Sequence, residues 1–538
     1  MSQKPANLAD QWQVINFSTV VLIATALSLV KGLISIKFFT NILSTKELSY
    51  FAIGIVAINF CQQVISLYLP WTLPRILARF EQDSESDEKY DYIASIIALY
   101  LFLGFLLFGG YIVGIRLLGG GSGIVSKIAP IAILIGMLWS ISFTYLGLSI
   151  YRQSPKNYLA IQNGIDYVPL IVSVLIVLTF QRTGHTALQG LFIGYIVVTF
   201  GFAIHYAIRE KIGHISIDHI RLALNYSSPF ALTSVLVILT PTVLIFLVQA
   251  IFETTDVATF WVGWSVSTIG LLFNAIPNVV FSPRLFQLYE TKGLFEALDF
   301  TQNFLKIYLF LAIPLFALIA FYAQPIVAIL TSREYLNSAS LFIILLAGQI
   351  IYGVWNFTGM GIPISYRVWE LPKSYAIGLL GGLFTALALA DYGPIGIAFG
   401  FLACNLIFII ISYSVTKSII RTEFVSKKTY LLLLLGVLIF FPVLLLTRFI
   451  FIKSILRQLI LFTILALVLT AIFTRANIKF MTIHSEEVRS LFKHAGAEQL
   501  LDTVYVNSVL SYLEKIERKN NFSNSNEKRT LASEKLLE

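Results

Sequence analysis

Two ionisable side chains lie inside long apolar stretches of this chain, and they are the first candidates for chemistry. Lys31 belongs to the apolar stretch 15–40, and Asp166 belongs to the stretch 157–181. On membrane-insertion scales, a lysine at the centre of a spanning helix costs roughly 2.5–3.5 kcal/mol. A lysine in such a place is therefore expected to face water, an oppositely charged partner or a bound anion.

Lys31 lies at the edge of a polar stripe if its stretch is helical. At 100° per residue it falls within an arc of about 140° that also contains Ser18, Thr25, Ser28, Gly32 and Ser35. The stripe is predicted to face a central cavity, where Lys31, Ser28 and Ser35 are candidate substrate-binding residues. A structural ion pair within the membrane is the alternative role for the lysine. Lys37 lies outside the stripe and can extend toward the interface, so it is the weaker binding candidate.

Asp166 shares a stripe about 60° wide with Gln162, Pro169 and Ser173. Three interpretations of the carboxylate remain open at this stage. It couples transport to H⁺ or Na⁺, it neutralises a lysine such as Lys31 in a structural ion pair, or it occupies a polar position that faces the cytoplasm.

Other polar residues interrupt the later apolar stretches. Asn274 and Asn278 are candidate substrate-binding residues, and Gln349 and Asn356 add further polarity. Prolines that kink helices in the same region suit a rocking motion but are also common in static bundles.

Residues 16–81 recur as residues 225–290, at one ungapped shift of 209 positions. The matching pairs are Asn16 with Asn225, Ser18 with Ser227, Thr45 with Thr254, Glu47 with Asp256, Phe51 with Phe260, Gly54 with Gly263, Pro74-Arg75 with Pro283-Arg284, and Glu81 with Glu290. Such internal symmetry in a hydrophobic chain is typical of transporters built from two repeated halves. The repeat is broken where Lys31 aligns with Thr240 and Lys37 with Phe246.

Each repeated motif also has a structural interpretation. Pro74-Arg75 and Pro283-Arg284 are expected to end a span at the cytoplasm, with Arg75 and Arg284 as headgroup anchors or as parts of a cytoplasmic gate. Gly54 and Gly263 are expected to permit close helix packing.

Composition places these residues in membrane-spanning helices. Apolar residues make up 57% of the chain and charged residues 12%, against roughly 25% charged in soluble domains. Stretches of about 20 apolar residues match the hydrocarbon core, and they do not alternate as barrel strands do. The sequence therefore predicts an all-α integral membrane protein with about 14 transmembrane helices, at 15–40, 48–70, 91–117, 126–150, 157–181, 187–208, 225–251, 257–282, 300–323, 339–363, 371–390, 393–415, 429–449 and 455–474.

These spans predict four regions. Residues 1–222 and 223–424 form two pseudo-symmetric lobes of six helices, residues 425–474 add a two-helix hairpin, and residues 475–538 form a partly disordered cytoplasmic tail. Because six is even, the lobes are parallel repeats related by an axis along the membrane normal.

The basic residues predict orientation in the cytoplasmic (inner) membrane. With the N-terminus inside, the inner loops hold about sixteen lysines and arginines and the outer loops about seven. Both termini are then cytoplasmic, and the first span is too long for a cleavable signal. The net charge of +9 suits an anionic inner leaflet and does not indicate nucleic acid. Cys61 and Cys404 fall within spans and imply no disulfide framework.

Several segments resemble one family of exporters. They are "FFTNILSTKELSYFAIGIVAI" (38–58), "LPRILARFE" (73–81), "NYSSPFALTS" (225–234), "FSPRLFQLYETKG" (281–293) and "DYGPIGIAFGFLACN" (391–405). Across residues 10–420 the chain resembles the multidrug/oligosaccharidyl-lipid/polysaccharide exporter superfamily, and within it the polysaccharide-exporter and O-antigen flippase branch. Fourteen spans fit the polysaccharide and peptidoglycan-precursor branches of the superfamily better than the twelve typical of multidrug extruders.

The resemblance implies a flippase that moves a polyprenyl-pyrophosphate-linked oligosaccharide across the cytoplasmic membrane, for surface polysaccharide or lipopolysaccharide synthesis. Its expected partners are this substrate, membrane lipids, H⁺ or Na⁺, and the polysaccharide polymerase or export machinery.

Two other classes compete with this interpretation. One is a cation-coupled multidrug-type antiporter. The other is a membrane-embedded polymerase or glycosyltransferase, which would place catalytic carboxylates or arginines in a sizeable outer loop, whereas the outer loops here are short. Neither a Walker loop nor metal-ligand spacing occurs, so no catalytic residue, metal site or cofactor is expected, and the chain is interpreted as a carrier.

Overall fold

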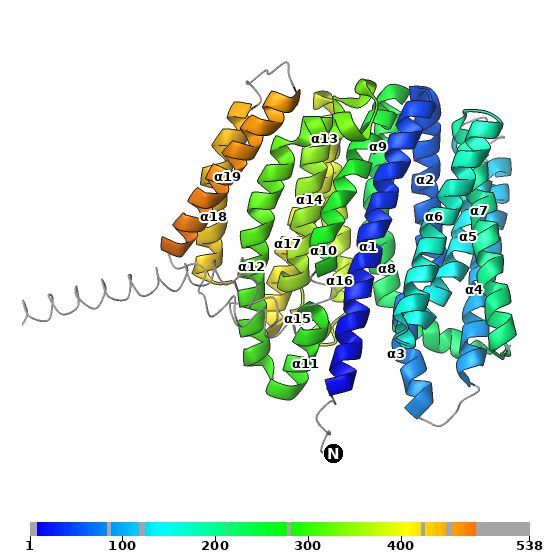
Figure 1. The fold of residues 1–538 in the computed structure, drawn as a ribbon. Coiled ribbons are helices and arrows are strands. Elements are labelled where there is room, and N and C mark those ends of the chain that lie inside the picture. Colours follow the sequence, from blue (N-terminus) through cyan, green and yellow to red (C-terminus); the bar gives the residue numbers. More distant parts are fainter. Residues whose placement is uncertain are drawn as a thin grey trace, which may run out of the picture. The chain divides into compact units, whose positions relative to one another are not determined.

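The computed structural model describes residues 8–82, 88–117, 124–211, 213–276, 281–420, 425–447 and 455–479. All of the regular elements in these ranges are helices (Figure 1), which confirms the predicted all-α class. Lipid enforces this choice, because every backbone polar group must be satisfied within its own segment.

The chain's contacts divide it into two compact units. The first comprises the described parts of Met1–Ala275, Ile326–Trp355 and Gly359–Ile419, and the second those of Ile276–Pro325, Asn356–Thr358 and Ile420–Glu538. This division does not test the predicted lobes 1–222 and 223–424, whose boundaries stay a prediction. Most of the predicted tail lies outside the described residues.

The first unit holds most of the helices. They are α1 (Leu8–Ile42), α2 (Thr45–Ser66), α3 (Leu69–Gln82), α4 (Glu88–Leu117), α5 (Ile124–Tyr151), α6 (Pro155–Thr179), α7 (Gly184–Arg209), α8 (Ile217–Ile251), α9 (Thr254–Ser267), η1 (Thr268–Gly270), α10 (Leu271–Ile276), η3 (Arg333–Tyr335), α14 (Ser338–Thr358), α15 (Gly361–Ile364), α16 (Glu370–Ala388), η4 (Ala390–Tyr392) and α17 (Pro394–Ile420), some of which end just across the division. α13 (Ala323–Leu330) crosses the division between the units.

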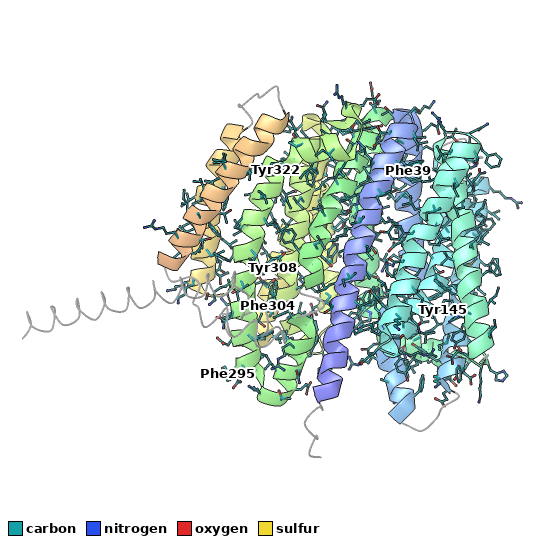
Figure 2. All side chains as sticks on the ribbon, in the orientation of Figure 1. Phe39, Tyr145, Phe295, Phe304, Tyr308 and Tyr322 are labelled. Atoms are coloured by element: carbon teal, nitrogen blue, oxygen red, sulfur yellow. The ribbon has the colours of Figure 1, made fainter. Side chains whose placement is uncertain are left out.

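The second unit is built on α11 (Ser282–Lys292), α12 (Leu294–Phe321), α18 (Lys427–Thr447) and α19 (Ile455–Lys479). Along α12, Phe304 and Tyr308 lie one turn apart (Figure 2) and pack on Phe357, with ring centroids 5.7 and 5.1 Å away. Aromatic contacts of this kind consolidate the unit's core.

Twelve candidate membrane spans occur among the described residues, judged by length and hydropathy. Each overlaps one of the first twelve predicted spans. The other two predictions, 429–449 and 455–474, fall on α18 and α19, where part of the side chains lie outside the described residues. The count of fourteen therefore stays a prediction.

The repeat is visible in the helix boundaries. α1 and α8 are both 35 residues long, and they begin and end 209 positions apart. The C-terminal ends of α6 and α16, Thr179 and Ala388, keep the same offset, so the repeat extends beyond the matching passage. At Gly54 an added Cβ would lie 2.4 Å from Leu188 Cδ1, and at Gly263 it would lie 2.8 Å from Leu341 Cβ. The close packing expected at both glycines is confirmed.

The second span is longer than predicted and is broken. α2 ends at Ser66, because Leu67 and Tyr68 adopt positive φ angles of 48° and 62°, which interrupt the helical path. Apolar helix then continues to Phe80. The expectation that Pro74 ends a span was wrong, since Pro74 lies inside α3. Because proline has no backbone N–H, Pro74 removes only one intrahelical hydrogen bond. The flanking apolar residues remain buried.

Candidate functional site

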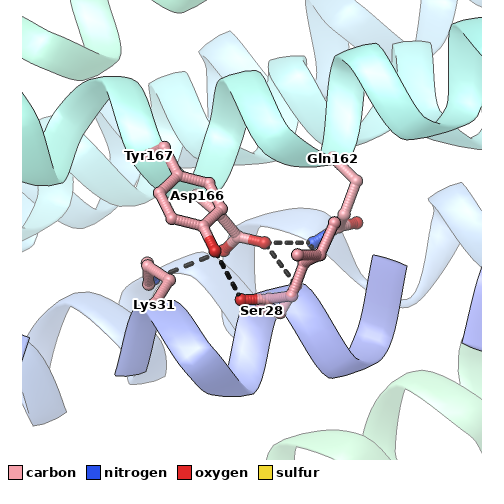
Figure 3. Close-up of polar contacts among 6 residues, drawn as sticks. Ser28, Lys31, Gln162, Asp166 and Tyr167 are labelled. Carbon is pink, nitrogen blue, oxygen red and sulfur yellow. Dashed lines mark hydrogen bonds and ion pairs between the residues drawn. The ribbon is translucent and has the colours of Figure 1, made fainter. Parts of the chain in front are cut away.

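Lys31 and Asp166 meet where α1 packs against α6 (Figure 3). The Lys31 Nζ lies 3.3 Å from Asp166 Oδ1. The two helices pack side by side, although the residues are far apart in the sequence. The lysine side chain keeps 29% of its surface exposed, against 10% for the aspartate. The lysine of the pair is thus accessible from outside the protein, whereas the carboxylate is almost completely covered.

The second carboxylate oxygen of Asp166 is held by neutral donors. Gln162 Nε2 donates to Asp166 Oδ2 at 2.7 Å and also lies 3.2 Å from Ser28 Oγ. Ser28 Oγ donates to the same oxygen (Figure 3). Ser28 and Lys31 are three residues apart on α1, and Gln162 and Asp166 four apart on α6, so each pair lies on one face of its helix.

Tyr167 adds a contact that the sequence analysis did not find. Its hydroxyl donates to the Leu27 carbonyl at 2.8 Å, which joins α6 to the α1 backbone one turn before Lys31. Tyr167 follows Asp166 directly but points about 100° away around the helix, so it lies outside the predicted polar stripe. No pattern in the sequence separates it from the other tyrosines.

The remaining candidates on α1 do not join this network. Ser35 is half-buried one turn beyond Lys31 and makes none of these contacts. Lys37 is exposed, and its Nζ lies 3.4 Å from the Thr331 carbonyl oxygen just after α13. The structure therefore separates the two lysines, and only Lys31 lies beside a carboxylate.

Asn274 lies in a helix–helix contact. It is buried at 6% exposure, and its Nδ2 lies 3.4 Å from the Gln349 carbonyl oxygen, which connects α10 with α14. Asn278 lies outside the described residues. The substrate-binding role of both asparagines stays a prediction.

Arg75 and Arg284 occupy unlike surroundings. The Arg75 guanidinium lies 5.3 Å from the ring centroid of Tyr226 on α8, a cation–π contact. Arg284, in the second unit, donates from Nη1 to Gln287 Oε1 at 2.5 Å within α11. Roles as headgroup anchors or gate residues stay predictions for both.

The second repeat has a counterpart of the Lys31–Asp166 pair. The positions 209 residues later hold Thr240 on α8 and Tyr375 on α16. Thr240 Oγ1 donates to the Tyr375 hydroxyl at 3.4 Å and lies 3.8 Å from Cys404 Sγ. Thr240 and Tyr375 are 2% and 1% exposed, and Cys404 is fully buried. The equivalent place is therefore neutral and closed.

Among the described residues, no group of three or more His, Cys, Asp or Glu side chains is placed to hold a metal ion. The α1–α6 network itself contains one acid, one base and neutral hydrogen-bonding groups. Such a set can bind and exchange ions.

Comparison with known proteins supports a transporter fold. A family described as "Polysaccharide biosynthesis protein" matches residues 156–340. No curated protein sequence matches the chain. Among solved structures, the lipid II flippase MurJ in an inward closed conformation matches with a TM-score of 0.63 at 20% identity, covering 86% of this chain and 99% of that one. A multidrug resistance MATE family transporter of the MOP superfamily, in an inward-facing conformation, matches with a TM-score of 0.55 at 12% identity, covering 76% and 99%.

These matches confirm, at the level of the fold, the predicted resemblance to the multidrug/oligosaccharidyl-lipid/polysaccharide exporter superfamily. The chain has the fold shared by the flippase and the multidrug transporter, which is a fold of multi-pass membrane transporters.

Proposed function

We propose that this protein is a flippase that moves a polyprenyl-pyrophosphate-linked oligosaccharide across the cytoplasmic membrane by alternating access. Lys31 would contact the anionic head group during transport. The observation that carries the proposal is a partly exposed lysine on an apolar spanning helix, paired with a carboxylate that is more buried than the lysine. In this proposal both termini are cytoplasmic, and the product serves surface polysaccharide synthesis, with O-antigen or lipopolysaccharide as the specific case.

The physical problem is the head group of the substrate. Its polyprenyl tail is soluble in lipid, whereas leaving even one polar group of the sugar unsatisfied in hydrocarbon costs several kcal/mol. A carrier that rocks between two lobes can shield the sugars while the tail stays in the bilayer. A lysine supplies a compact point charge for the pyrophosphate without fixing the identity of the sugar.

Two comparisons support this substrate class. The matched family is described by polysaccharide biosynthesis, and a structure of the same fold, which covers 86% of the chain, is described as a flippase of lipid II. From this function we expect contact with a polysaccharide polymerase or export machinery at the outer face.

A cation-coupled multidrug antiporter is the second candidate, and Asp166 is the observation that favours it. The carboxylate lies in a polar network within a spanning helix, and a multidrug transporter shares the fold. Lys31 weighs against it, because its ammonium already occupies the place beside Asp166 where a coupling cation would bind.

Depletion of the protein in its native host separates the two functions. The flippase should leave a lipid-linked oligosaccharide accumulated in the inner leaflet and reduce surface polysaccharide, without sensitising cells to cationic drugs. Measuring leaflet-resolved lipid intermediates and drug sensitivity in the same cells is the test. Normal surface glycan together with new drug sensitivity would contradict the flippase and support the antiporter.

A further inference from the structure

The Asp166 carboxylate is bound on both of its oxygens, and by groups of two kinds. Oδ1 faces the charged Lys31 at 3.3 Å. Oδ2 accepts hydrogen bonds from the neutral donors Ser28 and Gln162, the latter at 2.7 Å. Lys31 can therefore move away from Oδ1 while Ser28 and Gln162 remain hydrogen-bonded to Oδ2.

Burial shows which partner an incoming anion would meet. Asp166 is 10% exposed and Lys31 is 29% exposed. An anion approaching this place therefore reaches the ammonium rather than the carboxylate. The incoming charge also repels Asp166 and attracts Lys31, so both effects act to separate the pair.

The hydrogen bonds from the neutral donors Ser28 and Gln162 determine the free energy needed to separate Lys31 from Asp166. Removing one partner of a buried ion pair normally leaves an uncompensated charge, which is the expensive part of breaking it. Hydrogen bonds from neutral groups to a carboxylate are stronger than those between neutral groups. Because Ser28 and Gln162 bind the oxygen that Lys31 does not use, they continue to stabilise the carboxylate after the lysine moves away.

We propose that Asp166 is a releasable counter-ion for Lys31. The pyrophosphate of the substrate replaces Asp166 as the ion-pair partner of Lys31. Ser28 and Gln162 stabilise the Asp166 carboxylate by hydrogen bonds until the lysine returns. Ser28 and Gln162 are thus positioning residues that set the cost of the exchange. The inference rests on the proposed function, because it takes the pyrophosphate as the incoming anion.

The test is a binding cycle on the full-length protein in lipid nanodiscs, with farnesyl pyrophosphate as the probe and farnesol as the control without the anion. Gln162→Leu and Ser28→Ala are each made in the wild-type and in the Asp166→Asn background. Asp166→Ser replaces the amide variant if that variant does not fold. Gln189→Leu, which changes an exposed glutamine on α7, is the matched control.

Each loss of a donor should weaken probe binding by up to about tenfold in the wild-type background. Each donor binds the carboxylate before and after Lys31 leaves, so only the strengthening of its hydrogen bond after Lys31 has left affects the affinity. In the Asp166→Asn background the same changes should have little effect, because no carboxylate needs support. Asp166→Asn alone should bind the probe more tightly, since Lys31 no longer has a competing partner. Ser28→Thr keeps the hydroxyl donor and should restore binding, and Gln189→Leu should match the wild type.

Two results would overturn the inference in different ways. Equal weakening in both backgrounds would mean that Ser28 and Gln162 only pack the helices together, and the proposed role of Lys31 would stand. If the wild type, Lys31→Ala and Asp166→Asn all bind farnesyl pyrophosphate no better than farnesol, the inference and the head-group role of Lys31 fail together.

Discussion

The α1–α6 and α8–α16 interfaces are the same part of the fold built twice with opposite chemistry. In the first, Lys31 pairs with Asp166 and remains partly exposed. In the second, Thr240 contacts Tyr375 at 3.4 Å, and both residues are almost fully buried. The helices carry these residues at positions 209 apart, so the two interfaces differ in the side chains that they place at equivalent positions.

The comparison shows how a duplicated scaffold can separate two tasks. The neutral Thr240–Tyr375 pair is buried among aromatic rings, and the ring centroid of Phe408 lies 4.7 Å from that of Tyr375. Such a pair does not respond to an approaching anion. An exposed lysine beside a supported carboxylate does respond, because its partner can be exchanged. We therefore expect the first repeat to bind the head group and the second to provide a stable surface.

The largest expected effect comes from removing the charge of the first interface. Lys31→Ala should reduce flipping of a lipid-linked oligosaccharide by at least about 100-fold, because a charge-assisted contact with the substrate is lost. Lys31→Arg should retain part of the activity, since it keeps the charge in a different shape. Flipping is measured in proteoliposomes with equal protein content.

Lys37→Ala is the matched control for this experiment, because it removes an exposed lysine from the same helix. Its effect should be much smaller. Full activity of Lys31→Ala would show that neither head-group binding nor the ion pair matters for transport.

Moving the charged pair into the second repeat should be strongly destabilising. Thr240→Lys with Tyr375→Asp would place an ion pair where both positions are closed to water. The desolvation of two ions there should cost several kcal/mol and lower the thermal midpoint by many degrees. Detergent-solubilised protein can be compared by thermal unfolding, and an unchanged midpoint would mean that the second interface is as open as the first.

The contributions of the Lys31–Asp166 pair to stability and to transport can be measured separately. Asp166→Asn should reduce stability by about 1–3 kcal/mol, below the 3–5 kcal/mol of a fully buried pair because Lys31 is partly exposed. Combining it with Lys31→Met should recover stability but leave flipping abolished. Recovery of flipping in the double variant would instead identify the pair as purely structural.

The smallest effect is expected from the neutral counterpart. Tyr375→Phe removes the hydroxyl that Thr240 contacts and should cost about 1 kcal/mol of stability, with flipping close to wild type. A transport loss comparable to that of Lys31→Ala would contradict the assignment of separate tasks to the two repeats.

Much of the fold could be predicted because lipid leaves the chain few choices. Long apolar stretches must be helices, and the ungapped shift of 209 positions reappears in the boundaries of α1 and α8. Local interruptions were less predictable. Pro74 was expected to end a helix and instead lies inside α3, whereas the break falls at Leu67 and Tyr68, two residue types that carry no turn signal.

For the site, the sequence by itself determined which residues stand out, since the cost of a charge in hydrocarbon marks Lys31 and Asp166 without any structure. Only the tertiary structure decided that they meet, that Ser28 and Gln162 hold the carboxylate, and that Tyr167 ties α6 to the α1 backbone. Apart from the Gln162–Asp166 hydrogen bond within α6, those contacts join residues more than 130 positions apart. They depend on how two helices rotate and slide against each other, which is set by the packing of all their neighbours and not by either segment alone.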